Sequence, residues 1–330
     1  MPFVSDIAGP QRPVHNWPQP VRGAMRRTST IDTHPAGPSG ADVDLRARDV
    51  VVGGSGAVSV VNDVVVRAHL SERAIDQIEG VADERLDRLK GSRVGPGFRA
   101  VVGEVLGRDV ERSTPLALLL DDWAGASLVS GYATQHSAIT SGTEQKLPDG
   151  VADRMGGICA GFALDASLIG YARDQNIIPC VHGPLAPQLT NDADAMHPVE
   201  PLRAHGMRRM RRLDLNPHDG TSAAFDSHFR DTHVDEFGVE TIVHEYSVVG
   251  RVDVTTRTLS DVTATVRVLP WQECPGAIGS AGRVNGMTVG ELRNRIRTEF
   301  VGTSTCTHLN DTLRALGDLG ALLDERAQLV

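Results

Sequence analysis

Residues 25–66 recur, without a gap, 182 positions further along the chain. Of the 42 aligned positions 13 are identical, among them Met25-Arg26-Arg27, which returns as Met207-Arg208-Arg209. A repeat of this length predicts two units built from the same strands in the same order, since similar sequences form similar supersecondary structure.

The two copies differ in chemistry: at several aligned positions the second copy has ionisable side chains where the first has side chains that do not ionise. The aligned pairs are Val58/Glu240, Val60/Ile242, Asn62/His244 and Val64/Tyr246 and, at an offset of 191, Pro115/Cys306 and Ala117/His308. We expect the first copy to be scaffold and the second to carry a site. The alternative is neutral drift, in which the cysteine and histidine have settled into a core.

Composition narrows the class of protein. With 40% hydrophobic and 23% charged residues, the 330-residue chain has the balance of a soluble globular protein. Its net charge of −9 argues against nucleic-acid binding, which depends on basic surfaces. A local exception is the group Arg208, Arg209, Arg211 and Arg212. We interpret it as a solvated strand with carboxylate partners such as Asp214, or else as a clamp for a small anionic ligand.

Nothing in the sequence indicates export or a membrane. Met1–Pro20 has neither a basic nor an apolar signal region, and the most apolar stretch, Leu116–Ala133, contains Asp121-Asp122. Four cysteines in a chain of this length fit a reducing cytoplasm, with thiols free or bound to metal. We therefore predict a cytoplasmic protein with no membrane and no nucleic-acid partner; no heptad pattern indicates an oligomeric state.

The hydrophobic pattern predicts an α+β fold. β-Branched runs at 57–66 and at 239–249, 252–258 and 262–269 indicate antiparallel meanders, and helices are predicted from Pro115, Thr288 and Thr305. Residues 71–79 resemble a short helix, and 135–149 an exposed loop. The predicted organisation is a flexible Pro-rich arm (1–23), a degenerate first repeat (24–123), a connecting segment (124–200) and a second repeat with the site (201–330). The two meander-plus-helix units would pack as a pseudo-twofold pair.

Thr305-Cys306-Thr307-His308 is the sharpest chemical signal. A cysteine in the first turn of a helix meets unpaired amides that favour a thiolate. Adding Cys274 and His244 gives a set of soft nitrogen and sulfur ligands for zinc or iron, from which the predicted metal ligands are Cys274, Cys306 and His308. Asp231 or Glu240 could replace a member of this set. The alternative is an inert buried thiol beside a helix-capping histidine.

His244, Glu240 and Tyr246 are the candidate catalytic groups, since strand alternation would place them on one face. A metal-free alternative uses Cys306 as nucleophile with His244 or His308 as base. His228 and His233 are weaker candidates, Arg230-Asp231 is interpreted as structural, and Cys180-Val181-His182 as a chance repeat of the Cys-x-His pattern. No nucleotide-binding fingerprint is present, so no nucleotide cofactor is expected.

Several short segments together resemble one bacterial family of unknown function, DUF2889. They are Arg230-Asp231, Val243–Tyr246, Leu269-Pro270-Trp271, Glu273-Cys274-Pro275-Gly276-Ala277 and Thr303–Asp311. The resemblance extends from about Arg26 to Leu319, and its specific part is the Cys-Pro turn and the Cys-Thr-His-Leu helix start. It implies a bacterial cytoplasmic protein associated with the catabolism of aromatic, terpenoid or steroid compounds.

From these observations we expect a metal-assisted lyase or hydrolase that acts on a small, partly apolar catabolic intermediate. The rival hypotheses are a non-catalytic module with a structural metal or ligand-binding site, and the metal-free Cys/His enzyme.

Overall fold

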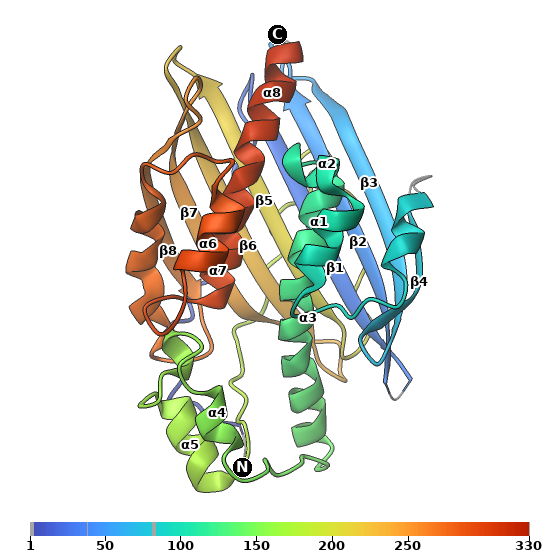
Figure 1. Ribbon diagram of the computed structural model, residues 1–330, viewed down its shortest axis with the longest axis vertical. Helices are drawn as coiled ribbons and strands as arrows, with labels where there is room; N and C mark the ends of the chain where they lie inside the picture. The colour runs from blue at the N-terminus through green and yellow to red at the C-terminus, as the bar shows by residue number, and fades with distance from the viewer. Residues whose placement is uncertain (1–2, 38, 81–83, 330) are drawn as a thin grey trace.

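The computed structural model describes residues 3–37, 39–80 and 84–329, and its centre is one eight-stranded antiparallel sheet (Figure 1). The strand order is β4-β3-β2-β1-β5-β6-β7-β8, so each half of the chain forms a four-stranded meander and the two meanders join edge to edge. The strands are β1 (Met25–Ala36), β2 (Gly40–Val52), β3 (Val58–Ser71), β4 (Ala74–Gly80), β5 (Met207–His218), β6 (Ser222–Val234), β7 (Glu240–Asp253) and β8 (Leu259–Val268). The predicted α+β class is confirmed at this level.

The repeat appears directly in the strand bounds. β1, β2 and β3 start and end 182 residues before β5, β6 and β7. β1 pairs antiparallel with β5, and Ser29 lies opposite Arg211, its own counterpart in the repeat. Each half also has a β-bulge at the same place, after Asp49 in β2 and after Asp231 in β6. A bulge inserts one extra residue and so moves the following side chains to the other face of the sheet.

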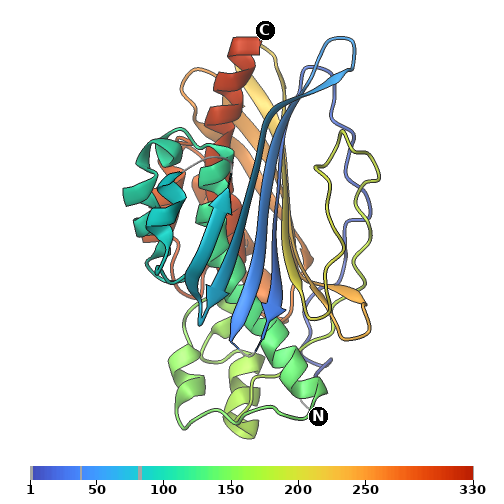
Figure 2. The same cartoon turned by 90° about the vertical axis from the view of Figure 1, so that its right-hand side faces the viewer.

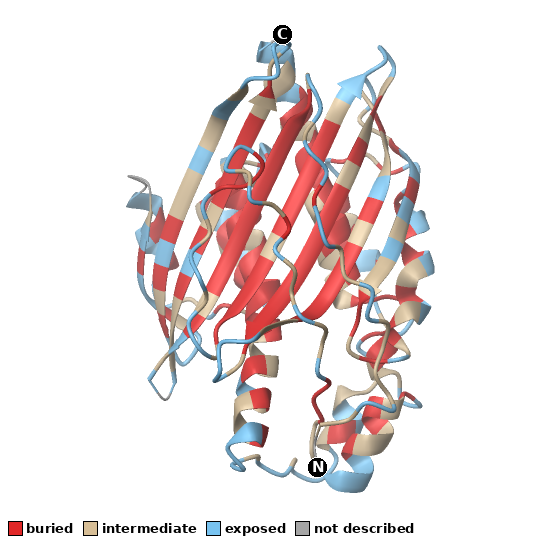
Figure 3. Cartoon of the chain, turned by 180° about the vertical axis from the view of Figure 1, so that it is seen from behind, coloured by how far each residue is buried: buried red, intermediate tan, exposed pale blue. Residues whose placement is uncertain are grey.

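Helices cover one face of the sheet, whereas two irregular segments cross the other (Figures 2 and 3). The α-helices are α1 (Phe98–Val105), α2 (Gly107–Glu111), α3 (Pro115–Thr140), α4 (Val151–Met155), α5 (Ser167–Gln175), α6 (Leu292–Glu299), α7 (Thr307–Ala315) and α8 (Leu319–Leu329). Short 3-10 helices are Glu84–Leu89, Ala160–Phe162, Cys274–Val284 and Leu316–Asp318. Two apolar cores result, one between the first half-sheet and α1–α3, the other between the second half-sheet and the C-terminal helices.

The central strands are buried on both faces and carry charge. Arg26 donates to both oxygens of Asp214, and Arg208 donates to both oxygens of Asp32. Each pair joins the arginine of one repeat to the aspartate of the other. The two pairs are equivalent, because Arg26 and Arg208 are 182 residues apart, as are Asp32 and Asp214. Bidentate pairing satisfies buried guanidinium groups. The solvated interpretation of this arginine group is therefore wrong: all four of its members are buried.

Two local predictions are also wrong. Residues 71–79 contain strand β4 rather than a helix, because Glu72 and Arg73 adopt positive φ and turn the chain back along β3. The loop predicted for 135–149 begins only after residue 140, because α3 continues to Thr140. Among the described residues no helix is both long and apolar enough to cross a membrane.

The predicted flexible arm instead lies against the sheet from residue 3 onward; residues 1 and 2 are outside the described residues. Its backbone bridges to Cys180, Trp271 and Val268. Trp17 is buried and donates from Nε1 to Nδ1 of His228 at 3.0 Å. These contacts fix the segment across the back of the second half-sheet.

Candidate functional site

Two imidazoles and a carboxylate meet on the helix-covered face of the second half-sheet. The ligand atoms of Asp231, His244 and His308 all lie within 4.8 Å of one another, and among the described residues they form the candidate metal-binding group. The rings of His244 and His308 stack with centroids 3.5 Å apart. Two histidines and one carboxylate form a donor set that suits zinc or non-haem iron.

The β-bulge places the first two of these residues. Asp231 on β6 lies opposite His244 on β7, whereas the next pair is Thr232 with Ile242, so Val243 is the extra residue. Asp231 and His244 therefore share the helix-facing side. Nδ1 of His244 lies 3.4 Å from an oxygen of Asp231 without the alignment of a hydrogen bond. It is thus a buried nitrogen with no hydrogen-bond partner among the described residues, which is costly unless a ligand satisfies it.

Asp231 is held as an anion by the strand beside it. Arg209 on β5 donates to both of its oxygens, at 2.9 and 3.1 Å. Burial is the largest single influence and raises the pKa of Asp231, but Arg209 and His244 together outweigh it and hold this pKa well below its usual value. Arg209 also contacts Asp122 on α3 and Asp311 on α7. Helix α3, which follows the first half-sheet in the chain, thus contacts the second half-sheet through Asp122.

His308 enters from the first turn of α7. Burial, reinforced by the neighbouring His244, lowers the pKa of His308 well below its usual value, so its ring is neutral and offers a lone pair at neutral pH. The helix starts one residue later than predicted: its N-cap is Cys306, and the Thr305 hydroxyl donates to the carbonyl of Gly302.

An apolar cavity of about 390 Å³ opens beside this group. One wall comes from the C-terminal half of α3, including Leu128 and Tyr132, and another from the connecting segment, including Ile158 and Ile178. The third wall contains the reactive side chains His244, His308, Cys274 and Cys306. A cavity of this size falls within the range of small-molecule sites.

Cys274 and Cys306 lie near the two imidazoles but do not belong to the candidate metal-binding group of Asp231, His244 and His308. Cys274 and Cys306 line the same cavity as His308, but neither sulfur meets the mutual 4.8 Å spacing of that group. Burial raises the pKa of both thiols. Of the predicted metal set Cys274, Cys306 and His308, the structure therefore brings all three to one cavity wall but groups only His308 with other donors.

Glu240 lies on the opposite face from the site predicted for it. The bulge at Val243 reverses the side to which residues 240 and 242 point, and Glu240 lines a different cavity on the back of the sheet. Tyr246 is on the correct face but fully buried behind Cys306, to whose sulfur its hydroxyl donates at 3.4 Å. Burial raises the pKa of Tyr246 well above its usual value. This residue contacts a cavity residue and does not itself line the cavity.

The first half preserves the same framework without the imidazoles. Arg27 donates to both oxygens of Asp49, as Arg209 does to Asp231. The position of His244 is held by Asn62, whose side chain donates to Asp49 at 3.1 Å. At the offset of 191 the counterpart of His308 is Ala117. In the first copy the carboxylate of Asp49 thus accepts a hydrogen bond from an amide, whereas in the second copy the carboxylate of Asp231 faces two imidazoles.

From the sequence, Asp231 was named as a possible substitute in the metal set, but the repeated Arg-Asp pair led us to interpret this residue as structural. The signal for a role in the site was the neighbouring Asn62/His244 difference. Sequence reasoning missed Cys159 and Cys180, which line the same cavity. His228 is no part of the site: it is bonded to Trp17 and Glu245 on the back face. His233 packs instead against His136, with ring centroids 4.6 Å apart.

The molecule is thus an α+β protein in which half of a continuous sheet carries a histidine–carboxylate group beside an apolar cavity. Residues 207–321 match the model of the family DUF2889, described as "Protein of unknown function". The predicted family is confirmed for this half, which contains every residue of the Asp231–His244–His308 group; the predicted extension back to about Arg26 lies outside the match. Neither curated proteins nor solved structures gave a match.

Proposed function

We propose that this protein is a cytoplasmic, metal-assisted lyase or hydrolase, and that Asp231, His244 and His308 hold the ion. The observation that carries the proposal is the convergence of three donor side chains within 4.8 Å, one of them with a buried, unpartnered nitrogen, at the wall of an apolar cavity. Three protein ligands leave coordination positions open for water or substrate.

The chemistry expected of such an ion is polarisation of a substrate carbonyl or activation of a bound water. Two imidazole ligands and one carboxylate ligand would supply one negative charge, so a divalent ion would keep its Lewis acidity. The cavity walls, with Leu128, Ile158 and Ile178, favour a substrate with an apolar body. Catabolic intermediates of aromatic, terpenoid or steroid type have this character, and a member of that class is the proposed substrate.

Two alternative functions, a structural metal site and a metal-free Cys/His enzyme, predict different features of the cavity and of Cys306. A structural metal site would be closed by four protein ligands and have no cavity beside it; the adjoining cavity of about 390 Å³ favours an open site. A metal-free enzyme would need Cys306 as thiolate. Burial raises the pKa of Cys306 despite the helix amides around its sulfur, which disfavours that nucleophile.

We also propose that the fold arose by internal duplication and that its halves pack about an approximate twofold axis near Ser29 and Arg211. Identical strand bounds at an offset of 182, bulges at equivalent places and the exchanged Arg26–Asp214 and Arg208–Asp32 pairs support it. The division into residues 24–123, 124–200 and 201–330 stays a prediction.

The direct test of the metal proposal is elemental analysis of the purified protein and of His244→Asn, His308→Ala and Cys306→Ala. The first two give the second half the residues of the first half, Asn62 and Ala117. We expect one zinc or iron per wild-type chain, loss of the ion in both histidine variants, and retention in Cys306→Ala, since its sulfur is outside the group. His69→Asn, which alters a half-exposed histidine paired with Asp42, is the control.

Replacement of the ion by Co²⁺ then separates an open site from a closed one. In an open site azide binds the cobalt and changes its visible spectrum, whereas four protein ligands leave the spectrum unchanged. A wild-type protein that contains no metal and takes up no Co²⁺ would rule out the metal-assisted function.

A further inference from the structure

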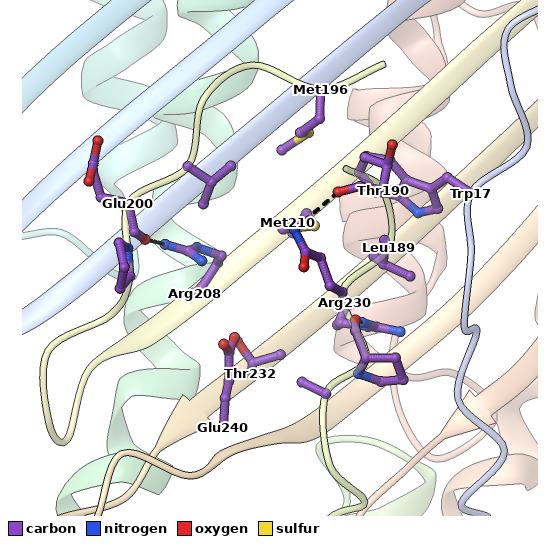
Figure 4. Close-up of a pocket in the computed structure, with 15 residues that line it drawn as sticks. Trp17, Leu189, Thr190, Met196, Glu200, Arg208, Met210, Arg230, Thr232 and Glu240 are labelled. Carbon is purple, nitrogen blue, oxygen red and sulfur yellow. Dashed lines mark hydrogen bonds between the residues drawn. The ribbon is translucent and has the colours of Figure 1, made fainter. Parts of the chain in front are cut away.

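A second cavity, of about 320 Å³, lies on the back of the sheet, under the segment 186–201 and beside Trp17 (Figure 4). The sheet separates it from the Asp231–His244–His308 group. Its apolar walls include Leu189, Met196 and Met210. Its floor is polar, and Glu240 is part of it.

The polar floor is a row that crosses three strands. Arg208 on β5 lies opposite Thr232 on β6, and the hydroxyl of Thr232 donates to Oε1 of Glu240 on β7 at 2.5 Å. Neighbouring strands are about 4.8 Å apart. The guanidinium and the carboxylate thus approach one cavity from β5 and β7, the strands on either side of β6 (Figure 4).

Both ends of this row have unused hydrogen-bonding capacity. Arg208 uses Nε and Nη2 on Asp32 and on the carbonyl of Glu200, whereas Nη1 has no hydrogen bond within the described residues. Within the described part of the chain, Glu240 accepts a hydrogen bond only from the Thr232 hydroxyl and forms no ion pair. By contrast the other arginine of the floor, Arg230, is fully engaged by Glu245 and by two carbonyls.

The first half shows that this capacity is specific to the second. Arg26, the counterpart of Arg208, uses Nη1 on the carbonyl of Ala195 and Nη2 on Asp214 and the carbonyl of Pro18, so the chain itself occupies its donors. The counterparts of Thr232 and Glu240 are Val50 and Val58. The repeat therefore acquired a hydroxyl and a carboxylate where the cavity is open.

We infer that this back cavity is a second ligand site, for a small zwitterion such as an apolar α-amino acid. Its ammonium would pair with Glu240, its carboxylate would accept from Nη1 of Arg208, and its side chain would pack on Leu189, Met196 and Met210. Because Asp32 and Glu245 already balance the two arginines, Glu240 leaves the floor with a negative charge that selects for a cation. A ligand that offers both groups satisfies both ends of the row.

Calorimetric titration with three matched probes tests this assignment: L-leucine, 3-methylbutylamine, which lacks the carboxylate, and 4-methylpentanoate, which lacks the amine. We expect L-leucine to bind and each analogue to bind at least tenfold more weakly. An amine that binds as tightly as leucine overturns the role of Arg208, and an acid that does so overturns that of Glu240. If L-leucine, L-methionine and L-phenylalanine all bind more weakly than about 1 mM, the site does not exist as inferred.

Variants locate the binding. Glu240→Gln keeps the shape and removes the charge, and we expect at least a tenfold loss of leucine affinity; Thr232→Val/Glu240→Val, with the residues of the first half, should abolish binding. Glu104→Gln on the exposed surface of α1 is the control. His308→Ala should bind leucine as the wild type does, so that failure of the metal proposal and failure of this one are distinguishable. Unchanged affinity in a folded Glu240→Gln variant overturns the inference.

Discussion

Both halves of the sheet contain a buried Arg-Asp ion pair, and they differ in the residue that lies beside its carboxylate. In the first half Arg27 and Asp49 are joined by the amide of Asn62; in the second half Arg209 and Asp231 face His244. The same holds on the back face, where the exposed pair Arg46–Asp63 corresponds to the buried pair His228–Glu245.

The difference teaches that the buried Arg-Asp pairs are the same in both copies while the groups beside them differ. The Arg-Asp pairs are retained in both copies because removing one member would leave a buried charge without a partner. The residues beside them changed from groups that do not titrate near neutral pH to imidazoles and a carboxylate. The proposed site thus lies on a framework of Arg-Asp pairing that the first half also contains.

The largest effect expected to test this comparison comes from breaking the shared framework itself. Arg27→Met and Arg209→Met should each lower the free energy of unfolding by about 3–5 kcal/mol, because Asp49 or Asp231 would be buried without its guanidinium. Urea denaturation measures both. Equal losses mean that the pairs are equivalent structural elements.

A double variant tests whether the loss of stability comes from the unpaired charge. Arg27→Met/Asp49→Leu removes both charges and should recover much of the loss, since an apolar pair can replace a buried ion pair. A first-half single variant that loses less than about 1 kcal/mol while Arg209→Met loses several would show that the two pairs do not do the same work.

Prediction from sequence succeeded where local pattern decides the outcome. The offset of 182 identified the two copies that contain β1–β3 and β5–β7, and β7 and β8 lie close to the runs predicted at 239–249 and 262–269. The run at 252–258, predicted as a separate strand, is instead the end of β7 and the turn that follows it. His244, Cys306 and His308 do meet at one cavity. These residues were identified because their counterparts in the first copy, Asn62, Pro115 and Ala117, do not ionise. That comparison needs no knowledge of the fold.

The failures have a common physical origin in tertiary structure. Glu240 and His244 are an even number of residues apart, and only the bulge at Val243 sends them to opposite faces. Strict alternation cannot reveal an inserted residue. Cys180, dismissed as chance, lines the cavity because the connecting segment folds against α3, and that contact has no local signature.

Acid should reveal the His228 difference, with an effect of intermediate size. Nδ1 of His228 accepts from Trp17 and Nε2 donates to Glu245, so the bonded ring is neutral. Burial lowers the pKa of His228 from 6.5 to about 4 although Glu245 opposes this. The unfolded chain therefore binds more protons between these values, and stability should fall as pH drops from about 6.5 towards 4, by up to roughly 3 kcal/mol for this group.

Urea denaturation at pH 8, 6 and 5, followed by the fluorescence of Trp17 and the other tryptophans, measures that fall. His228→Gln preserves one donor and one acceptor but does not titrate, so its stability should depend less on pH; other buried histidines keep part of the slope. Arg46→Gln, at the matching position of the first half, should leave the slope unchanged. An identical slope in His228→Gln would contradict the assignment.

The smallest expected effect concerns the two helix starts that the repeat aligns. Thr114 caps α3 by accepting from the amide of Ala117 at 3.3 Å, whereas α7 starts at Cys306 without a side-chain cap bond. Thr114→Ala should therefore cost about 1 kcal/mol, and Cys306→Ser should change stability by about 0.5 kcal/mol or less, because serine is a better N-cap than cysteine. Thermal denaturation of both variants compares them. A loss of several kcal/mol in Cys306→Ser would mean that the thiol has a structural role in its buried contact with Tyr246, and that the second helix start was not released from structural constraint.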